Sequence, residues 1–416
     1  MKNFQWIASL AMVLGYATST QAALFDLETK ITASDAAAND WFGISVAISG
    51  NIALVGVPFD DDGGINSGSA YLFDVTTGNQ LAKLTADDAA AFDEFGASVA
   101  ISGNMALVGA HRDDDGYSGS GSAYLFDVTT GIQFAKLTAA DAEAFDWFGG
   151  SVAISGNTAL IGASYDDDGG GNSGSAYLFD VTTGKQLAKL TASDATASDR
   201  FGNSVAISGN TALVGAERDD DGGSKSGSAY LFDVTTGNEL AKLTATDAAP
   251  RNVFGGSVAI SGNTALVGAR GNDDGGSSSG SAYLFDVTTG NQLAKLTATD
   301  AAPFDRFGGS VAISGNRALV GAYGDDDGGG SSGSAYLFDV TTGSQLAKLT
   351  ATDAAPGDVF GSVAISGNIA LVGARNDDDG GSSSGSAYLF ENIIPEPSTL
   401  LLGVMACLGF LQRRER

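Results

Sequence analysis

The residues most able to do chemistry in this chain are aspartates, which recur as triplets in glycine-rich stretches. Carboxylate and backbone carbonyl oxygens are the ligands that Ca²⁺ prefers, and it takes six to eight of them. The sequence therefore makes the triplets, and a pair in one weaker copy, candidate calcium ligands, with calcium as the expected cofactor. The candidates are Asp60, Asp61, Asp62, Asp113, Asp114, Asp115, Asp166, Asp167, Asp168, Asp219, Asp220, Asp221, Asp273, Asp274, Asp325, Asp326, Asp327, Asp377, Asp378 and Asp379.

A second interpretation of the triplets needs no ion. Asp and Gly are favoured in turns for backbone reasons alone. Two charges ~4 Å apart repel by only about 1 kcal/mol in water, so exposed triplets can persist without a cation. Three consecutive aspartates also cannot all point at one spot. Weak calcium sites of the extracellular kind and ion-free turns both remain open.

Other chemistry has little support in the sequence. His111 is the single histidine, and no serine or cysteine nucleophile motif accompanies it. Paired carboxylates can hydrolyse glycosides, but their repetition along the chain favours structural or multivalent binding. We therefore predict that the protein is not an enzyme.

The elements that must position the aspartates come from a repeat. Phe-Gly recurs every 53 residues, at Phe42, Phe95, Phe148, Phe201, Phe254, Phe307 and Phe360. A constant period of this length indicates a repeat architecture in which no unit buries its core alone.

Each unit contains four short apolar runs bounded by turn residues, and they predict strands. In the sixth unit the runs are 310–314, 318–322, 334–339 and 345–351. The third run is apolar on both faces, as a blade packed between two neighbours requires. The first run is built of small residues that suit a crowded centre. The fourth carries a lysine in every copy, which is typical of a protected outer edge.

The chain ends predict a closed ring. The seventh unit stops at Phe390 without a fourth strand, whereas residues 30–33 lie 53 residues before the equivalent residues 83–86. The N-terminal strand can therefore complete the last blade. The predicted fold is all-β: a seven-bladed propeller of four-stranded antiparallel blades, followed by a short C-terminal apolar helix.

Charge is distributed unevenly in this fold. The loops between second and third strands and those between blades should emerge on one face, and both are rich in aspartate, whereas the other turns are almost uncharged. Residues 24–394 carry 17 basic and 47 acidic residues, a formal charge of −30. We expect such a surface to repel nucleic acid and anionic lipid and to favour cations and basic partners.

The Phe-Gly, the Val-Gly-Ala and the Tyr-Leu-Phe strand resemble the FG-GAP repeat of integrin α-subunit propellers, across residues 24–394. The resemblance implies a surface-exposed, integrin-like binding propeller. The family's Asp-x-Asp-x-Asp-Gly calcium loop lies between its first two strands, where this chain has only a tight turn such as Gly209-Asn210. The family's calcium ligands are therefore not carried over.

Both ends of the sequence are predicted to be export or sorting signals. Residues 1–23 have the charge, apolar core and small-residue site of a signal peptide. Residues 395–416 resemble the PEP-CTERM sorting signal of Gram-negative bacteria, with Pro-Glu-Pro, an apolar segment and an arginine-rich end; a plain C-terminal membrane anchor is the alternative. The resemblance implies processing by an exosortase-type enzyme and delivery to the cell surface, outer membrane or extracellular matrix.

Two functions fit these observations. In the first, the protein is a non-catalytic adhesion or binding module whose Asp-rich face, assisted by calcium, binds extracellular polysaccharide or a surface protein with avidity. In the second, it is a structural scaffold of the envelope or matrix without a specific ligand.

Overall fold

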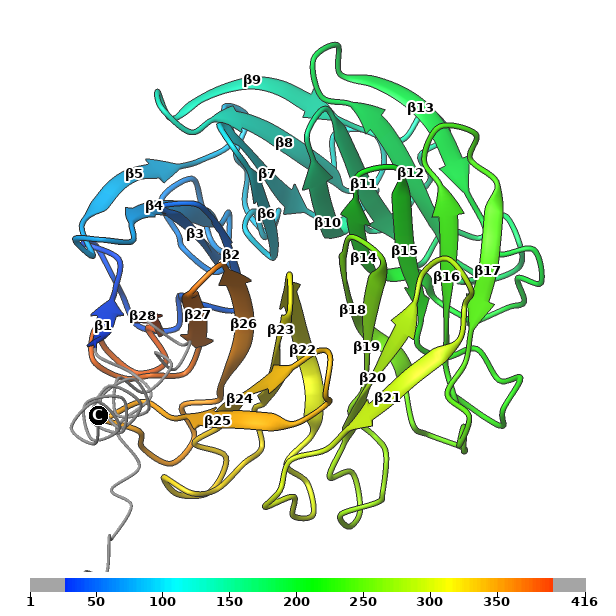
Figure 1. The fold of residues 1–416 in the computed structure, drawn as a ribbon. Coiled ribbons are helices and arrows are strands. Elements are labelled where there is room, and N and C mark those ends of the chain that lie inside the picture. The colour runs from blue at the N-terminus through cyan, green and yellow to red at the C-terminus, as the bar shows by residue number, and fades with distance from the viewer. Residues whose placement is uncertain (1–26, 392–416) are drawn as a thin grey trace, which may run out of the picture.

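The computed structural model describes residues 27–391, and within them the chain forms a ring of seven four-stranded antiparallel sheets (Figure 1). The predicted all-β propeller is confirmed. No helix occurs in residues 27–391, so none there could cross a membrane. The signal peptide, the PEP-CTERM segment and the short C-terminal helix lie outside the described residues.

The blades follow one another along the chain. Blade 1 is β2 (Ser45–Ser49), β3 (Ile52–Val57), β4 (Ser69–Asp74) and β5 (Gln80–Leu84); blade 2 is β6 (Ser98–Ser102), β7 (Met105–Ala110), β8 (Ser122–Asp127) and β9 (Ile132–Leu137); blade 3 is β10 (Phe148–Ser155), β11 (Thr158–Ala163), β12 (Ser175–Asp180) and β13 (Lys185–Leu190). Blade 4 is β14 (Phe201–Ser208), β15 (Thr211–Ala216), β16 (Ser228–Asp233) and β17 (Glu239–Leu243); blade 5 is β18 (Phe254–Ser261), β19 (Thr264–Ala269), β20 (Ser281–Asp286) and β21 (Gln292–Leu296); blade 6 is β22 (Phe307–Ser314), β23 (Arg317–Ala322), β24 (Ser334–Asp339) and β25 (Gln345–Leu349).

Blade 7 closes the ring with strands from both ends of the chain. It consists of β26 (Phe360–Ser366), β27 (Ile369–Ala374), β28 (Ser386–Glu391) and β1 (Leu27–Ile31), in which β1 pairs antiparallel with β28. Glu28 accepts a hydrogen bond from the backbone N–H of Thr352, in the segment that joins blade 6 to blade 7. The predicted closure by an N-terminal strand is therefore what the structure has.

The repeated motif supplies the packing between blades. Phe201 is fully buried, and its ring centroid lies 5.5 Å from that of Tyr230 and 5.7 Å from that of Phe232. Leu178 of the preceding blade belongs to the same hydrophobic cluster. Each inter-blade core thus takes side chains from two blades, which is why one unit cannot bury its core alone.

Two glycines of each unit permit this close approach. A Cβ on Gly162 of β11 would lie 2.0 Å from the carbonyl oxygen of Gly202 in the next blade. Gly202, which follows the repeated phenylalanine, has a φ of 88°, a region that favours glycine. The Phe-Gly and Val-Gly-Ala patterns are therefore requirements of blade contact.

Candidate functional site: the loop face

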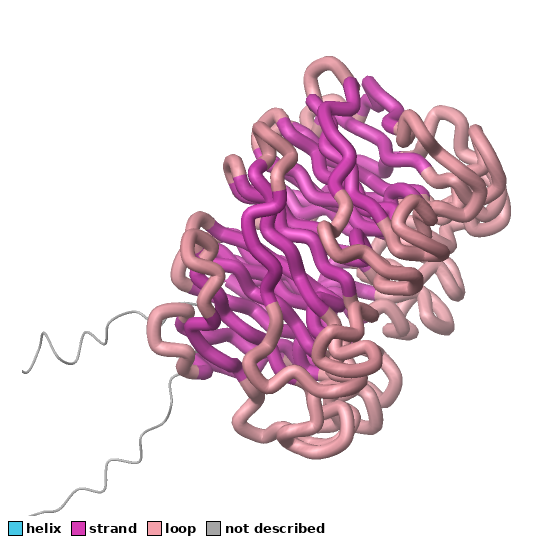
Figure 2. Tube along the Cα trace, turned by 90° about the vertical axis from the view of Figure 1, so that its right-hand side faces the viewer, coloured by secondary structure: helices cyan, strands magenta, loops and turns pink. Residues whose placement is uncertain are grey.

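The loops between second and third strands and the loops between blades lie on one face of the ring, which we call the loop face. Figure 2 shows the long loops gathered on one side of the strands and shorter turns on the other. Backbone hydrogen bonds join the two kinds of loop; Phe92 N–H, for example, donates to the carbonyl of Ile65. The loop face is therefore one connected surface.

Each aspartate of a triplet has a different role in its loop. The first, Asp60, accepts a hydrogen bond from the backbone N–H of Asp62 (3.1 Å) and is 4% exposed. The second, Asp61, accepts one from the backbone N–H of Asn66 (2.8 Å). Such side-chain bonds to nearby backbone are why aspartate is favoured in turns. The second aspartate is thereby directed away from the other two.

The first and third aspartates bind a lysine. Lys83 Nζ lies 2.9 Å from Asp60, 2.6 Å from Asp62 and 2.8 Å from Asp35, an aspartate of the loop that enters the blade. The Tyr71 hydroxyl lies within hydrogen-bond distance of Asp35 (2.8 Å) and Asp60 (3.0 Å), which share its one hydrogen, and the ammonium lies 5.2 Å from the Tyr71 ring centroid. We call this set of lysine, tyrosine and three carboxylates a clasp.

The clasp recurs in every blade. Its lysines are Lys83, Lys136, Lys189, Lys242, Lys295, Lys348 and, from the N-terminal strand, Lys30. Blade 5 differs, because Asn272 replaces the first aspartate and Lys295 contacts two carboxylates, those of Asp247 and Asp274. There Asn272 Nδ2 donates to the hydroxyl of Tyr283 (3.3 Å).

The clasp lysine does not project into solvent as an edge-protecting charge would. The Lys83 side chain is 18% exposed. Burial opposes its charge, but hydrogen bonds to Asp35 and Asp62 outweigh burial and raise the pKa of Lys83 above its ordinary value. Burial likewise opposes the charge of Asp166, yet Lys189 and Tyr177 hold the pKa of that carboxyl below its usual range. Lys83 and Asp166, which belong to two different clasps, are therefore both ionised at neutral pH.

The carboxylate groups meet the first requirement of a metal site. Oxygens of Asp35, Asp60 and Asp62 lie within 4.8 Å of one another, and the grouping recurs in other blades, so these groups could hold a metal ion. The lysine ammonium already lies between the same oxygens. A cation bound there would have to displace it, losing three charge-assisted hydrogen bonds.

The structure thus divides the predicted ligands into two sets. The first and third aspartates of each triplet converge, and the second does not: Asp61, Asp114, Asp167, Asp273 and Asp378 each accept a hydrogen bond from a backbone N–H five residues further on. Three other members of the clasp lie outside the triplet's loop, namely the inter-blade aspartate, the tyrosine of the third strand and the lysine of the fourth. Their constant 53-residue period is the signal that could have joined them to the triplets.

A second inter-blade aspartate is buried without a lysine. Asp40 is 7% exposed and accepts a hydrogen bond from the backbone N–H of Ala37 (2.6 Å). Burial raises its pKa to about 6, and it does the same for Asp93 and Asp146. Asn252 takes this place in the fifth unit and is also buried. A neutral side chain therefore fits the position.

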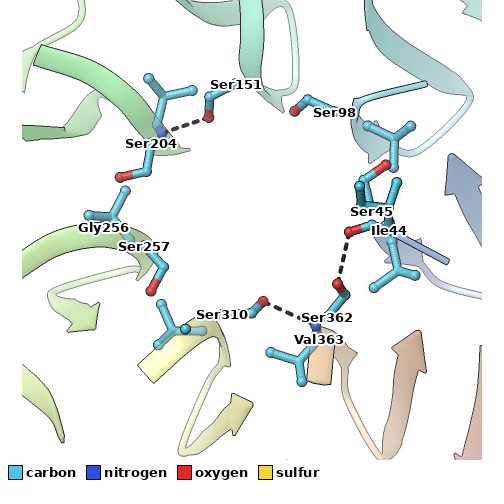
Figure 3. Close-up of a pocket in the computed structure, with 16 residues that line it drawn as sticks. Ile44, Ser45, Ser98, Ser151, Ser204, Gly256, Ser257, Ser310, Ser362 and Val363 are labelled. Atoms are coloured by element: carbon cyan, nitrogen blue, oxygen red, sulfur yellow. Dashed lines mark hydrogen bonds between the residues drawn. The ribbon is translucent and has the colours of Figure 1, made fainter. Parts of the chain in front are cut away.

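Serines line the axis of the ring. Figure 3 shows Ser45, Ser98, Ser151, Ser204, Ser257, Ser310 and Ser362 around an axial cavity of about 260 Å³. Their hydroxyls bind the backbone of the next blade: Ser204 donates to the carbonyl of Gly255 (2.8 Å), and Ser151 accepts from the N–H of Val205 (3.0 Å). These serines connect the inner strands of neighbouring blades.

Between the axis and the clasps lies a set of residues that differ from unit to unit, which we call the inner ring. It comprises the residue before each Phe-Gly (Trp41, Glu94, Trp147, Arg200, Val253, Arg306 and Val359) and the pair after each second strand (Pro58-Phe59, His111-Arg112, Ser164-Tyr165, Glu217-Arg218, Arg270-Gly271, Tyr323-Gly324 and Arg375-Asn376). Gly309, which lines the axial cavity, lies against the Tyr323 ring, and this places the inner ring beside the axis.

Inner-ring side chains contact one another across blades. The Trp147 ring lies 4.1 Å from the Tyr165 ring and 5.2 Å from His111, between centroids. Glu217 binds Arg270 at 2.8 Å. Sequence reasoning missed this ring because it compared the units for what they share. Aligning them at the 53-residue period shows where they differ.

His111 belongs to this ring. Its Nε2 lies 3.4 Å from Glu94, and burial, helped by the charge of Arg112, lowers its pKa to about 4. It is therefore neutral at pH 7. Its Nδ1 is buried without a hydrogen-bond partner. The ring contact with Trp147 makes packing its evident role.

The opposite face is less neutral than the sequence suggested. Asp74 ends β4 and accepts a hydrogen bond from the backbone N–H of Thr77 (2.8 Å), and Asp127, Asp180, Asp233, Asp286 and Asp339 do the same in their own turns. Each of these six turns thus carries one carboxylate, where the loop face carries several.

The fold and the loop face define a class: a closed seven-bladed propeller with its long loops on one face. The FG-GAP repeat model matches residues 25–73, 79–126, 132–179, 185–232, 238–285, 291–338 and 344–390, and the chain belongs to this family. No curated protein matches it. A similar solved structure is the computationally designed Ika8 protein, with 18% sequence identity and a TM-score of 0.52 over 86% of this chain and 98% of the other. That likeness concerns the fold alone.

Proposed function

We propose that this protein is an exported, non-catalytic binding module that recognises its partner with the loop face. One observation carries the proposal: on a scaffold of nearly identical blades, the inner-ring residues that differ between units gather beside the axis on this face. Repetition serves the blade cores and the clasps, whereas the inner-ring contacts differ from blade to blade, so the shared fold does not dictate which residues stand there. Polar and aromatic residues on loops are where binding function concentrates, and here most are half-buried while Arg112 and Arg306 are exposed.

The partner class follows from the predicted export and sorting signals. Residues 1–23 and 395–416 support export, exosortase-type processing and display at the cell surface, in the outer membrane or in the extracellular matrix of a Gram-negative bacterium. A protein displayed there meets extracellular polysaccharide and surface proteins. The acidic body disfavours nucleic acid as a partner.

The absence of catalysis is part of the proposal. Glu94 and His111 are the nearest approach to an acid–base pair, but His111 packs on Trp147 and has a lowered pKa. Carboxylate pairs in the clasps bind lysine, so they offer neither a free nucleophile nor a proton donor. These observations support a binding role.

For calcium we propose a narrower role than the sequence suggests. Each clasp already holds a cation, the lysine ammonium, and calcium binds there by displacing it. Such exchange favours weak binding, with dissociation constants at or above the millimolar range of extracellular sites. Calcium then acts as a competitor that loosens clasps at high concentration, and not as a resident cofactor.

The test compares two sets of charge-neutralising substitutions in residues 24–394, the segment that contains the whole closed ring. The loop-face set changes Asp61, Asp114, Asp167, Asp220, Asp273, Asp326 and Asp378 to Asn. The matched control changes Asp74, Asp127, Asp180, Asp233, Asp286 and Asp339 to Asn on the opposite face. An asparagine Oδ1 can still accept the backbone hydrogen bond, so the turns keep their conformation.

Surface plasmon resonance then measures binding to immobilised dextran, cellulose oligomers and alginate, and to outer-membrane extracts. We expect the loop-face set to change the affinity for the bound polymer or extract by about tenfold or more, because fixed charges act on partner encounter and affinity. The opposite-face set should leave it unchanged. Equal behaviour of both sets and the wild type, or no binding at all, would favour the structural scaffold instead.

A further inference from the structure

A pocket of about 300 Å³ opens on the loop face between blades 6 and 7. It is lined by Phe304 and Arg306 from the loop that enters blade 6, Tyr323 and Ser331 from the next loop, and Val359 and Arg375 from blade 7. Two arginines in one small pocket are unexpected on a surface where carboxylates far outnumber cations.

Neither arginine has a carboxylate partner among the described residues. Arg375 Nε is buried and makes no hydrogen bond, and its guanidinium carbon lies 5.7 Å from the Trp41 ring centroid. Arg306 donates to the Tyr323 hydroxyl (3.1 Å), with its guanidinium carbon 5.3 Å from that ring. Burial lowers the pKa of Arg375, and Tyr323 partly offsets the effect.

Other arginines of the protein form ion pairs with carboxylates. Arg112 lies 2.9 Å from Glu94, Arg270 lies 2.8 Å from Glu217, and Arg317 lies 2.9 Å from Asp339. The Arg375 guanidinium is partly buried without an ion-pair partner among the described residues, and the hydration it loses is only partly offset by its contact with the Trp41 ring. The Arg375 guanidinium therefore favours the binding of an anion in this pocket.

The aromatic walls narrow the kind of anion. Phe304 is 61% exposed at the edge of the pocket. Exposed aromatic surface beside a cationic pocket favours a ligand with a ring beside its charge. The body's charge of −30 disfavours a polyanion, so the ligand should carry one negative group on an otherwise uncharged frame.

We propose that this pocket binds the carboxylate of a small ring-bearing ligand, with Arg306 and Arg375 holding the carboxylate and Phe304 contacting the ring. The planar guanidinium fork matches a carboxylate better than a spherical anion. The ring belongs either to a sugar acid, such as a terminal uronate of a polysaccharide, or to an aromatic acid. The inference rests on the proposed binding role of the loop face and names one ligand class for it.

The experiment titrates residues 24–394 with glucuronate and with benzoate in a calorimeter. Glucose and benzamide are the neutral counterparts, and sulfate is an anion without a ring. The variants are Arg306→Gln and Arg375→Gln. The matched control is Arg251→Gln, which removes an exposed arginine from the same face without touching the pocket. Arg306 is exposed, so its variant is not expected to affect folding even if that of Arg375 does.

We expect saturable binding of one of the two acids and none of its neutral counterpart. Each pocket variant should weaken that binding by about tenfold or more, as for the loss of a charge-assisted hydrogen bond, while Arg251→Gln leaves it unchanged. Which acid binds decides between sugar and aromatic ligands. The loop-face Asp→Asn set should strengthen the binding.

Three results would overturn the inference: no binding of either acid, equal binding of sulfate, or equal weakening by Arg251→Gln. The proposed function would survive them if polymer binding still depends on the loop-face aspartates. Conversely, carboxylate binding that persists while polymer binding ignores the loop face would remove the proposed function and leave the pocket.

Discussion

The clasps and the inner ring lie on the same face but differ in how they use charge. The clasp is nearly identical in six blades and satisfies its carboxylates internally, with Lys189 bound to Asp141, Asp166 and Asp168 in blade 3. The inner ring changes from blade to blade and leaves some charges unpaired, as at Arg375. We conclude that repetition marks the structural chemistry of this protein, and that departures from repetition mark its recognition chemistry.

If that comparison holds, the largest effect should follow from removing a clasp lysine. Lys189→Met leaves Asp166, 3% exposed, without its cation, and we expect a loss of about 2 to 3 kcal/mol in the free energy of unfolding. Lys185→Met removes an exposed lysine from the same strand and should cost less than about 0.5 kcal/mol. Thermal and urea unfolding measure both. Equal small losses would show that the clasp is not structural.

The pH dependence of stability should be the next largest effect. The pKa of Asp40, Asp93 and Asp146 is about 6 in the folded chain. Because the unfolded chain releases these protons at lower pH, stability falls as pH rises from about 4 to 6 and returns on acidification. The lowered pKa of clasp carboxyls such as Asp166 makes stability fall again below about pH 4. We therefore expect a melting temperature a few degrees higher at pH 5 than at pH 7.

Asp146→Asn checks the assignment of that pH dependence. Asn252 shows that asparagine fits the equivalent position, so the variant should fold and should lose part of the rise in melting temperature between pH 7 and pH 5. An unaltered pH profile in the variant would assign the effect to other groups.

A smaller loss should follow from removing one hydroxyl of a clasp. Tyr177 donates to Asp166 at 2.8 Å, so Tyr177→Phe should cost about 1 kcal/mol in the free energy of unfolding. Tyr165→Phe is the inner-ring counterpart, because Tyr165 uses its ring to contact Trp147 and Arg200. It should be nearly neutral. A larger loss at Tyr165 than at Tyr177 would reverse the contrast between the two regions.

The smallest effect on stability should come from an inner-ring charge. Arg200 lies 4.6 Å from the Tyr165 ring centroid and 3.6 Å from Glu217, both weak contacts at a partly exposed site. Arg200→Gln should change stability by about 0.5 kcal/mol or less. Urea unfolding checks the value, and a loss as large as that of Lys189→Met would make the inner ring structural.

The fold was predictable because a constant period encodes it. Phe-Gly every 53 residues, four apolar runs in each unit and the displaced fourth strand were enough to predict seven blades and their closure, and β1 pairs with β28 as expected. The sequence shows that glycines such as Gly162 recur, but only the structure shows that close contacts between blades require them.

The candidate site was predictable only in part. Clustered aspartates suggested a cation, but they did not show which cation. Lys83 lies 48 residues from Asp35 and 23 from Asp60, and no local pattern links residues so far apart. In the fifth unit Asn252 and Asn272 replace two aspartates without any change in the strand order of the blade. The fold therefore does not require a carboxylate at either position. The pocket between Arg306 and Arg375 depends on two blades meeting, which only the structure shows.

The central claim is that lysine is the resident cation of the acidic loops, and calcium titration tests it most directly. Calorimetry of residues 24–394 and of Lys189→Met, with melting in calcium and in chelator, is the measurement. We predict no saturable heat below about 1 mM calcium for the wild type and unchanged melting, with a new, calcium-stabilised site in the variant. Micromolar binding to the wild type with a raised melting temperature would contradict the account.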